Sequence, residues 1–294
     1  TTWKSIGNGD DFVAQSVNLS GLTPGTTYHY RIEAKNAEGT SYGKDSTFTT
    51  KDFPSLAYSY DSTLCVGDVL SITNQSTISM GTLSYVWQIR NSSGSLVHTS
   101  TDVNPTFTMA SAGTYTIKLT ASSSDAVTTT KTTGLVVEAI PTPSITAGGA
   151  TTFCQGGTVT LTGSTGYQSY MWSNGSTTSS IAVADSNAYT LTVSSANGCS
   201  GSTSIAVDVN PLPTATVVSA TGDYDFCDGS SLTLEAPTGA SGYQWYKDGS
   251  AITGGTSSTL SATSSGSYAV EVTSSDGCSS LSSAQSVTKN VLPT

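Results

Sequence analysis

Histidine and carboxylate side chains are the groups in this sequence that could carry acid–base chemistry, and they are few. The 294-residue chain contains 2 histidines and 20 Asp plus Glu residues. A hydrolytic triad needs a nucleophile, a base and an orienting group within reach of one another. His29 alternates outward between Tyr28 and Tyr30 on an expected strand, and His98 follows an Asn-Ser-Ser-Gly turn. We predict that both histidines are solvated strand residues and that the chain has no catalytic site.

Two acidic clusters could bind a cation. They are Asp10-Asp11 and the group formed by Asp223, Asp225 and Asp228. Calcium takes six to eight oxygen ligands, and three alternating aspartates without a recognisable loop pattern supply too few. A turn-rich linker is the favoured interpretation of the second cluster and calcium the alternative, so no metal and no cofactor is assigned.

Cysteine is the third reactive residue type. The five cysteines are Cys65, Cys154, Cys199, Cys227 and Cys278. None forms a Cys-x-x-Cys pair, which argues against a zinc site. The last four fall into two similarly spaced pairs, which predicts disulfides 154–199 and 227–278 and an oxidising compartment. Cys65 has no counterpart of this kind, so we expect a free thiol, either buried as a small apolar residue or reactive towards another molecule.

Composition excludes several classes of partner. The net charge is −10 and only 10% of residues are charged, against about 25% in typical soluble domains. Such a chain repels phosphate backbones and anionic bilayers, so we expect no nucleic acid and no direct membrane insertion. No apolar run approaches the ~20 residues of a membrane helix. We expect the targeting information of the protein to lie outside this chain.

Proline-containing segments divide the chain into units. They occur at residues 52–54, 140–143, 210–213 and 291–293, and proline stiffens linkers and cannot donate to a sheet ladder. We therefore predict four domains, which span residues 1–51, 52–140, 141–212 and 213–294. The first is too short for a whole sandwich.

An internal repeat is the strongest structural signal. In each of the last two units a tryptophan follows the first cysteine by 18 residues, and the second cysteine follows a tyrosine by 10. The second unit has the same tryptophan and tyrosine strands, and apolar residues alternate with polar ones, which is typical of half-buried strands. The expected core aromatic residues are Trp87, Trp172, Trp245, Tyr115, Tyr189 and Tyr268. The predicted fold class is all-β, with tandem immunoglobulin-like β-sandwich domains in an elongated array.

Three family resemblances follow from short stretches of the sequence. Leu22-Thr23-Pro24-Gly25 with Tyr28 resembles the tyrosine corner of a fibronectin type III domain. Residues 52–140 resemble PKD-like domains in the stretches Cys65-Val66-Gly67-Asp68, Tyr85-Val86-Trp87 and Ala112-Gly113-Thr114-Tyr115. Residues 141–294 resemble the Ig-like repeats of very large Bacteroidota surface proteins in Phe153-Cys154-Gln155-Gly156-Gly157, Asn197-Gly198-Cys199-Ser200 and Asn210-Pro211-Leu212-Pro213.

The resemblances imply a function in adhesion. They imply a non-catalytic stalk segment of a large secreted adhesin of the gliding-motility type, exported by type IX secretion. The implied location is the extracellular, outer-membrane-associated surface of a Gram-negative bacterium. The implied partners are a surface polysaccharide, a solid surface or another cell-surface protein.

Two alternatives remain open at this stage. The modules could be a spacer within a secreted multidomain enzyme, or they could bind carbohydrate themselves. Carbohydrate binding usually needs an exposed aromatic platform, for which Tyr246 and Tyr167 are the candidates. Either tyrosine could equally be a turn residue.

Overall fold

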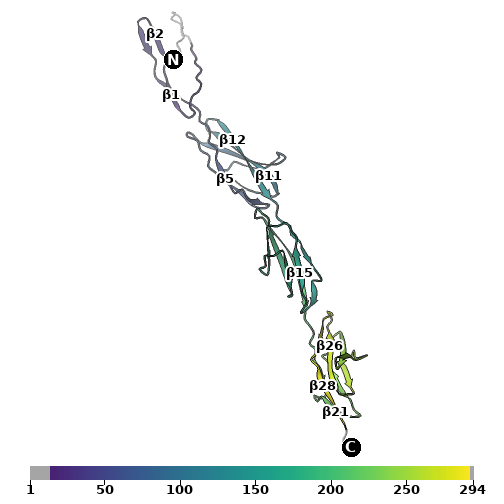
Figure 1. Ribbon diagram of the computed structural model, residues 1–294. Coiled ribbons are helices and arrows are strands. Elements are labelled where there is room, and N and C mark those ends of the chain that lie inside the picture. The colour runs from purple at the N-terminus through teal and green to yellow at the C-terminus, as the bar shows by residue number, and fades with distance from the viewer. Residues whose placement is uncertain (1–13, 292–294) are drawn as a thin grey trace. The chain divides into compact units, whose positions relative to one another are not determined.

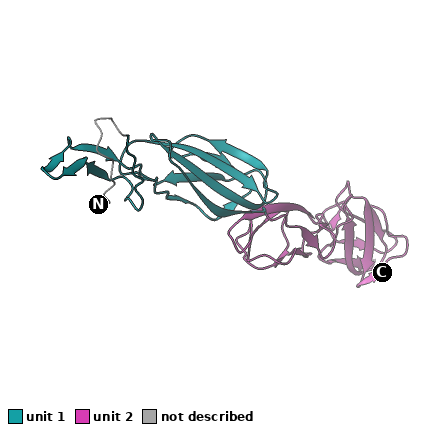
Figure 2. Ribbon diagram, turned by 90° about the horizontal axis from the view of Figure 1, so that it is seen from above, with its two compact units in different colours: residues 1–140 teal, residues 141–294 magenta. Residues whose placement is uncertain are grey.

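The computed structural model describes residues 14–291, so Asp10-Asp11 lies outside the described residues. The chain forms two compact units, Thr1–Ile140 and Pro141–Thr294, shown in teal and magenta in Figure 2. The division falls within the proline-containing segment 140–143. Strands numbered along the chain in Figure 1 are the regular elements of both units.

The first part of unit 1 is a pair of two-stranded sheets. They pair β1 (Thr27–Tyr30) with β4 (Ser46–Thr49), and β2 (Glu33–Asn36) with β3 (Gly39–Tyr42). The Tyr28 hydroxyl accepts a hydrogen bond from the backbone N–H of Thr23 at 2.8 Å, and the Tyr28 ring stacks on Phe48. The hydrogen bond joins Tyr28 to the corner at Thr23, and the ring contact joins it to β4.

The rest of unit 1 is a β-sandwich, which we call sandwich 1. One sheet has the order β10 (Thr106–Thr108), β7 (Val69–Asn74), β5 (Tyr58–Tyr60). The other has the order β6 (Leu64–Cys65), β12 (Thr128–Glu138), β11 (Gly113–Ser123), β8 (Leu83–Asn91), β9 (Leu96–Ser100). All neighbouring strands are antiparallel except β6 and β12, which are parallel.

Unit 2 contains two further sandwiches. In sandwich 2, one sheet has the order β13 (Ile145–Ala147), β15 (Val159–Gly163), β17 (Ser180–Val183). The other sheet has the order β14 (Thr152–Cys154), β19 (Ser200–Asn210), β18 (Asn187–Ser194), β16 (Ser169–Trp172). In sandwich 3, one sheet has the order β20 (Val218–Ser219), β22 (Leu232–Glu235), β25 (Thr259–Ala262). The other sheet has the order β21 (Asp225–Cys227), β28 (Gln285–Asn290), β26 (Gly266–Thr273), β23 (Gly242–Lys247), β24 (Ser250–Ala251). Strand β27 (Ser279–Leu281) also pairs with β26. The fold is therefore all-β, with tandem immunoglobulin-like β-sandwiches.

Alternation of apolar and polar residues builds each core. Along β11, Tyr115, Ile117, Leu119 and Ala121 are buried and the residues between them face outward. Successive side chains of a strand point to opposite faces, so this pattern buries one face of the sheet. Each sandwich has its own separate hydrophobic cluster, centred on Trp87, Trp172 or Trp245.

The indole N–H group of each of the three tryptophans has a hydrogen-bond partner. The indole N–H groups donate to backbone carbonyls of Asp102, Thr178 and Ser257 at 2.8–3.0 Å. An indole N–H is a donor that usually finds a partner when it is buried. A tryptophan therefore fits these core positions without an unsatisfied polar group.

Candidate functional site: the disulfide-linked junction of sandwiches 2 and 3

The two histidines lie in different surroundings, and neither faces a nucleophile–base arrangement. His29 Nδ1 lies 2.7 Å from Asp45 Oδ2, with the two side chains 68% and 58% exposed. The residue opposite His29 on β4 is Thr47. The His98 ring lies against Phe107, with 5.4 Å between ring centroids. The exposed His29–Asp45 pair lacks the buried orienting carboxylate that a triad uses.

The acidic cluster near β21 is used in contacts within sandwich 3. Asp225 Oδ2 accepts a hydrogen bond from the Asn290 side chain, and Asp228 forms an ion pair with Lys289. Lys289 hydrogen-bonds to the Asp228 carboxylate and lowers its pKa below the ordinary value. Among residues 14–291, no three His, Cys, Asp or Glu side chains gather in a way that could hold a metal ion.

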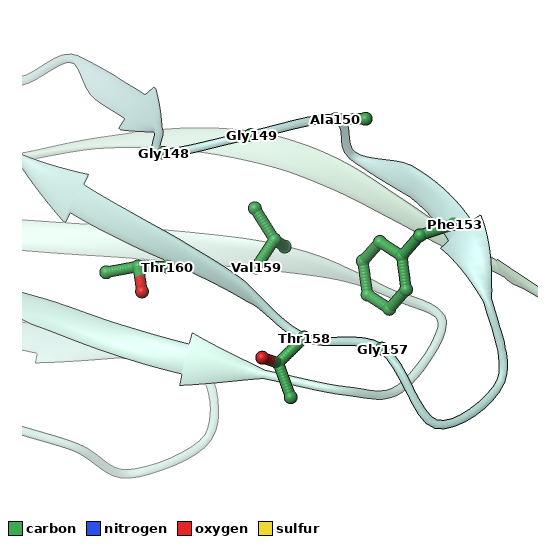
Figure 3. Close-up of a pocket in the computed structure, with 8 residues that line it drawn as sticks. All are labelled: Gly148, Gly149, Ala150, Phe153, Gly157, Thr158, Val159 and Thr160. Atoms are coloured by element: carbon green, nitrogen blue, oxygen red, sulfur yellow. The ribbon is translucent and has the colours of Figure 1, made fainter.

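A shallow hollow of about 320 Å³ lies at one edge of sandwich 2 (Figure 3). Gly148, Gly149 and Ala150 border one side, and the Phe153 ring points into the space. Thr158 and Thr160 contribute the side-chain hydroxyl groups of the lining, and the rest of it is apolar or glycine. No titratable side chain lines this hollow, so its lining offers no group for acid–base catalysis.

A second hollow, of about 310 Å³, lies on the outer face of sandwich 3 and includes Tyr246, Glu271 and Leu281. The Tyr246 hydroxyl donates a hydrogen bond to Glu271 Oε2 at 3.1 Å, which raises the pKa of the phenol. Tyr246 is half-buried, and Leu281 is 60% exposed. Tyr167, the other expected platform residue, instead packs edge-on against Tyr170 beside the core of sandwich 2.

The cysteines form a different pattern from the one that the spacing predicts. Cys154 of sandwich 2 is bonded to Cys278 of sandwich 3, across 124 residues of sequence and with 5.5 Å between Cα atoms. Cys227 is a free, exposed thiol. The predicted pairs 154–199 and 227–278, each within one sandwich, are therefore wrong.

Strand geometry explains why a disulfide within sandwich 2 cannot form. Cys154 lies opposite Asn210, the last residue of β19, whereas Cys199 directly precedes Ser200, the first residue of that strand. Ten residues of strand separate these ends by about 33 Å. A disulfide needs Cα atoms within about 4.4–6.8 Å of each other. The two cysteines therefore lie at opposite ends of their sandwich and are too far apart to bond to each other.

Cys65 is also not the free thiol that the sequence predicts. Both Cys65 and Cys199 are disulfide-bonded. Sandwich 1 therefore also contains a bonded cysteine. The chain has two disulfides, and the one thiol left over lies in sandwich 3.

The junction at Cys154 is built from strand ends and a turn. Cys278 is fully buried in a turn in which Ser274 N–H donates to the Cys278 carbonyl and Gly277 N–H donates to that of Ser274. The Cys278 sulfur lies 4.0 Å from the carbonyl oxygen of Asn210, the residue that pairs with Cys154. The last strand of sandwich 2 therefore meets the turn of sandwich 3 at the disulfide.

Tyrosine corners are the repeated feature that sequence reasoning missed in the three sandwiches. The hydroxyls of Tyr115, Tyr189 and Tyr268 each donate to a carbonyl four residues earlier, at 2.8–3.1 Å. All three rings are buried. The available signal was a tyrosine at the start of the long strand, two residues after a glycine or asparagine turn position, and we interpreted it as core packing alone.

Comparisons with known proteins find a family match in the last sandwich and several similar solved structures. Residues 213–293 match the family described as Ig-like domain CHU_C associated. The PKD1 domain of Vibrio anguillarum Epp is 28% identical, over 30% of this chain and 95% of that domain, with a TM-score of 0.26. A Bacteroides ovatus protein, SGBP-B of a mixed-linkage glucan utilization locus, is 16% identical over 82% of this chain and 71% of its own, with a TM-score of 0.25. A 1.5-MDa bacterial ice-binding adhesin is 13% identical over 81% of this chain and 99% of that chain, with a TM-score of 0.30.

Curated proteins give no match to this chain. Within residues 14–291, no helix is long and apolar enough to cross a membrane.

Proposed function

We propose that this chain is a non-catalytic stalk segment of a large secreted cell-surface adhesin. The observation that carries the proposal is the disulfide between Cys154 and Cys278, which joins two consecutive sandwiches rather than closing one. A covalent bond between consecutive modules limits their relative movement, and a stalk that holds an adhesive region away from a surface needs this property.

The chemistry of the surface supports the same function. Disulfides persist in oxidising environments outside the cytosol. The chain has few charged residues and a net charge of −10, so it resists association with anionic surfaces other than through specific contacts. The match of residues 213–293 to an Ig-like domain family supports a modular, repeated architecture.

The proposal extends to the organisation and location of the protein. The modules are residues 1–51, a partial fibronectin type III-like domain; 52–140, a PKD-like/Ig-like domain; and two Ig-like domains at 141–212 and 213–294. Separate hydrophobic clusters in the last three support these divisions. The parent protein is a gliding-motility adhesin of a Gram-negative bacterium, exported by type IX secretion to the outer membrane surface. Its partners are a surface polysaccharide, a solid surface or another cell-surface protein.

The test is the identity of the parent polypeptide. Mass spectrometry of the intact source protein, with peptide mapping beyond Thr1 and Thr294, gives its length and its other domains. Protease treatment of intact cells, followed by detection of peptides from this chain, gives its location. A surface-exposed chain with thousands of residues of similar modules agrees with the proposal. A shorter chain with a hydrolase domain would instead make these modules an enzyme spacer.

Carbohydrate binding is a second candidate function, and the hollow at Tyr246 favours it. The ring of Tyr246 can stack on a sugar face, and the neighbouring carboxylate of Glu271 can accept hydrogen bonds from sugar hydroxyl groups. The test is the binding of a panel of soluble glycans to the full chain by calorimetry. Tyr246→Ala should weaken binding about tenfold, or 1.4 kcal/mol. Tyr42→Ala, at an exposed tyrosine of β3, is the matched control. Absence of binding to every glycan, or equal loss in both variants, would remove this candidate.

A further inference from the structure

We propose that Cys227 is the attachment point for a further sandwich of the same type, through a disulfide to the buried turn cysteine of that sandwich. The cross-link seen between sandwiches 2 and 3 would then recur at the next junction. The inference rests on the repeat within this chain, and it holds for an adhesin stalk and for an enzyme spacer alike.

Strand pairing places three cysteines at the same point of their sandwiches. Cys65, Cys154 and Cys227 each end a short strand that runs parallel to the last strand of its sandwich. Their Cα partners are the final residues of those strands, Glu138, Asn210 and Asn290. Each cysteine therefore lies at the end from which the chain leaves its sandwich.

Backbone hydrogen bonds repeat in the same register. The residue after each cysteine donates its N–H to the carbonyl of the final strand residue, at 2.8–2.9 Å in all three sandwiches. The third residue after each cysteine donates to the carbonyl of the cysteine, at 3.0–3.1 Å. The glycine between them, Gly67, Gly156 or Gly229, has a φ of 88–93°. A positive φ at this position is that of a type II turn, so the local geometry around the three cysteines is the same.

Cys65 and Cys154, which occupy this position in sandwiches 1 and 2, both form disulfides. Cys154 is bonded to the turn cysteine of the sandwich that follows it, and Cys65 is disulfide-bonded as well. Cys227 has the same backbone setting but is exposed and free. The bonded state of its equivalents in the same chain is the observation that identifies a thiol partner for Cys227.

The geometry of the existing junction also defines that partner. Cys199 and Cys278 occupy equivalent turns, Asn-Gly-Cys and Asp-Gly-Cys, in which the N–H four residues before the cysteine donates to the cysteine carbonyl. Both side chains are buried. Asn290 ends β28 as Asn210 ends β19. The partner of Cys227 is therefore a cysteine in a turn of this kind, placed against the Asn290 carbonyl.

The bond forms by thiol–disulfide exchange with a disulfide oxidant. The Cys227 thiolate attacks the oxidant disulfide, and a mixed disulfide forms as one oxidant thiolate leaves. The thiolate of the turn cysteine then attacks the Cys227 sulfur, and the second oxidant thiolate leaves. The two protein thiols lose two protons and two electrons, and the oxidant is reduced to its dithiol.

The first experiment maps Cys227 in the secreted parent protein. Free thiols are trapped with N-ethylmaleimide before digestion, and disulfide-linked peptides are identified by mass spectrometry without reduction. We expect the Cys227 peptide to be linked to a peptide that contains Asn-Gly-Cys or Asp-Gly-Cys. A Cys227 adduct with N-ethylmaleimide, a link to glutathione, or a link to a second Cys227 peptide would overturn the inference. This result does not depend on the length of the parent protein, so the inference and the proposed function can fail independently of each other.

A second experiment tests the junction geometry directly. A copy of residues 215–294 is appended after Thr294, where Leu292-Pro293-Thr294 repeats Leu212-Pro213-Thr214. The copy carries Cys227→Ser, so that one Cys227 remains, and the chain is oxidised with glutathione disulfide. We expect a Cys227 peptide linked to a Cys278-type peptide. This link should exceed Cys227 dimerisation between chains by about 1,000-fold at micromolar protein, because linked modules have effective concentrations of roughly millimolar.

The matched control replaces the cysteine of the appended turn. With Cys278→Ser in the copy, Cys227 should form no link within the chain and should release a thiol that reacts fully with N-ethylmaleimide once glutathione is removed by a mild reductant, while the Cys154–Cys278 link persists. Equal labelling of Cys227 in both extended chains would contradict the assigned partner.

Discussion

Buried aromatic side chains in the three sandwiches combine apolar burial with one satisfied polar atom. Tyr268 is 3% exposed, and its hydroxyl reaches the Ser264 carbonyl at 2.9 Å. The same arrangement holds for Tyr189 and Tyr115. Each hydrogen bond ties the start of a long strand to the loop before it. The tyrosine therefore determines both the packing of the core and the path of the chain at the corner.

Removal of one hydroxyl measures this contribution. We expect Tyr268→Phe to lower the free energy of unfolding of sandwich 3 by about 1 kcal/mol, because one hydrogen bond is lost and the Ser264 carbonyl loses its partner. Hydrogen exchange of sandwich 3 peptides gives the local free energy. Tyr42→Phe, at an exposed tyrosine, should leave it unchanged. A loss in the control as large as that in Tyr268→Phe would contradict the corner as the cause.

Asp52 provides a prediction about pH at the linker before sandwich 1. Its carboxylate accepts hydrogen bonds from the Ser79 hydroxyl at 2.6 Å and from the Ser79 N–H at 2.8 Å. These bonds favour the charged form and lower the pKa of Asp52 below its ordinary value. Because the folded pKa lies below the unfolded one, the contribution to stability is present above the unfolded pKa and is lost as the pH falls through the folded value.

The measurement is the carbon-13 chemical shift of the Asp52 carboxyl as a function of pH. We expect its midpoint to lie below that of an aspartate in an unfolded peptide, and Ser79→Ala to move it back towards the ordinary value. An Asp52 midpoint that Ser79→Ala leaves in place would show that Ser79 is not the cause.

At the scale of elements, the turn after each short parallel strand depends on glycine. Gly67 has a φ of 93°, and nothing lies within 4 Å of the site where a Cβ would stand. Gly134, within β12 of the same sandwich, also has open space at this site but no positive φ. Because an added Cβ meets no neighbouring atom at either position, a comparison of the two isolates the backbone strain that a side chain causes at positive φ.

We expect opposite results from alanine at these two glycines. Gly67→Ala should destabilise sandwich 1 by about 1–2 kcal/mol, because an L-residue is strained at positive φ. Gly134→Ala should be neutral or stabilising by about 0.5 kcal/mol, because glycine loses more freedom on folding than alanine. Denaturant unfolding followed by the fluorescence of Trp87, with the other three tryptophans, Trp3, Trp172 and Trp245, replaced by Phe in every chain, reports sandwich 1. Equal effects of the two substitutions would be inconsistent with strain at Gly67.

Strand alternation made most of this architecture predictable from the sequence. The tryptophan and tyrosine strands, the core face and the proline-containing boundary at residues 140–143 all follow from local pattern. The disulfide pairing did not, because it depends on a parallel contact between β14 and the far end of β19. Local pattern shows that Cys154 and Cys199 belong to the same unit, but it does not show that they lie at opposite ends of an 11-residue strand.

At the scale of the whole molecule, the Cys154–Cys278 disulfide affects how the two sandwiches of unit 2 unfold. Its loop encloses most of both sandwiches, because the two cysteines have a sequence separation of 124. On the chain-entropy treatment, such a loop stabilises the folded state by about 5 kcal/mol. This stabilisation appears in full only when both sandwiches unfold, because one folded sandwich still orders part of the loop. The disulfide therefore couples the two sandwiches rather than strengthening each one alone.

Cys278→Ser tests this coupling in the full chain. We expect sandwiches 2 and 3 of the wild-type chain to unfold in closely overlapping transitions under oxidising conditions, and in Cys278→Ser the less stable of the two to unfold at lower denaturant. Hydrogen exchange of peptides from each sandwich, measured across a denaturant series, separates the two transitions. Cys227→Ser is the matched control, because this thiol is free in the chain, and it should leave both transitions in place. If Cys278→Ser lowered the stability of sandwich 3 alone and by the full amount, the disulfide would act within one sandwich, contrary to the junction described above.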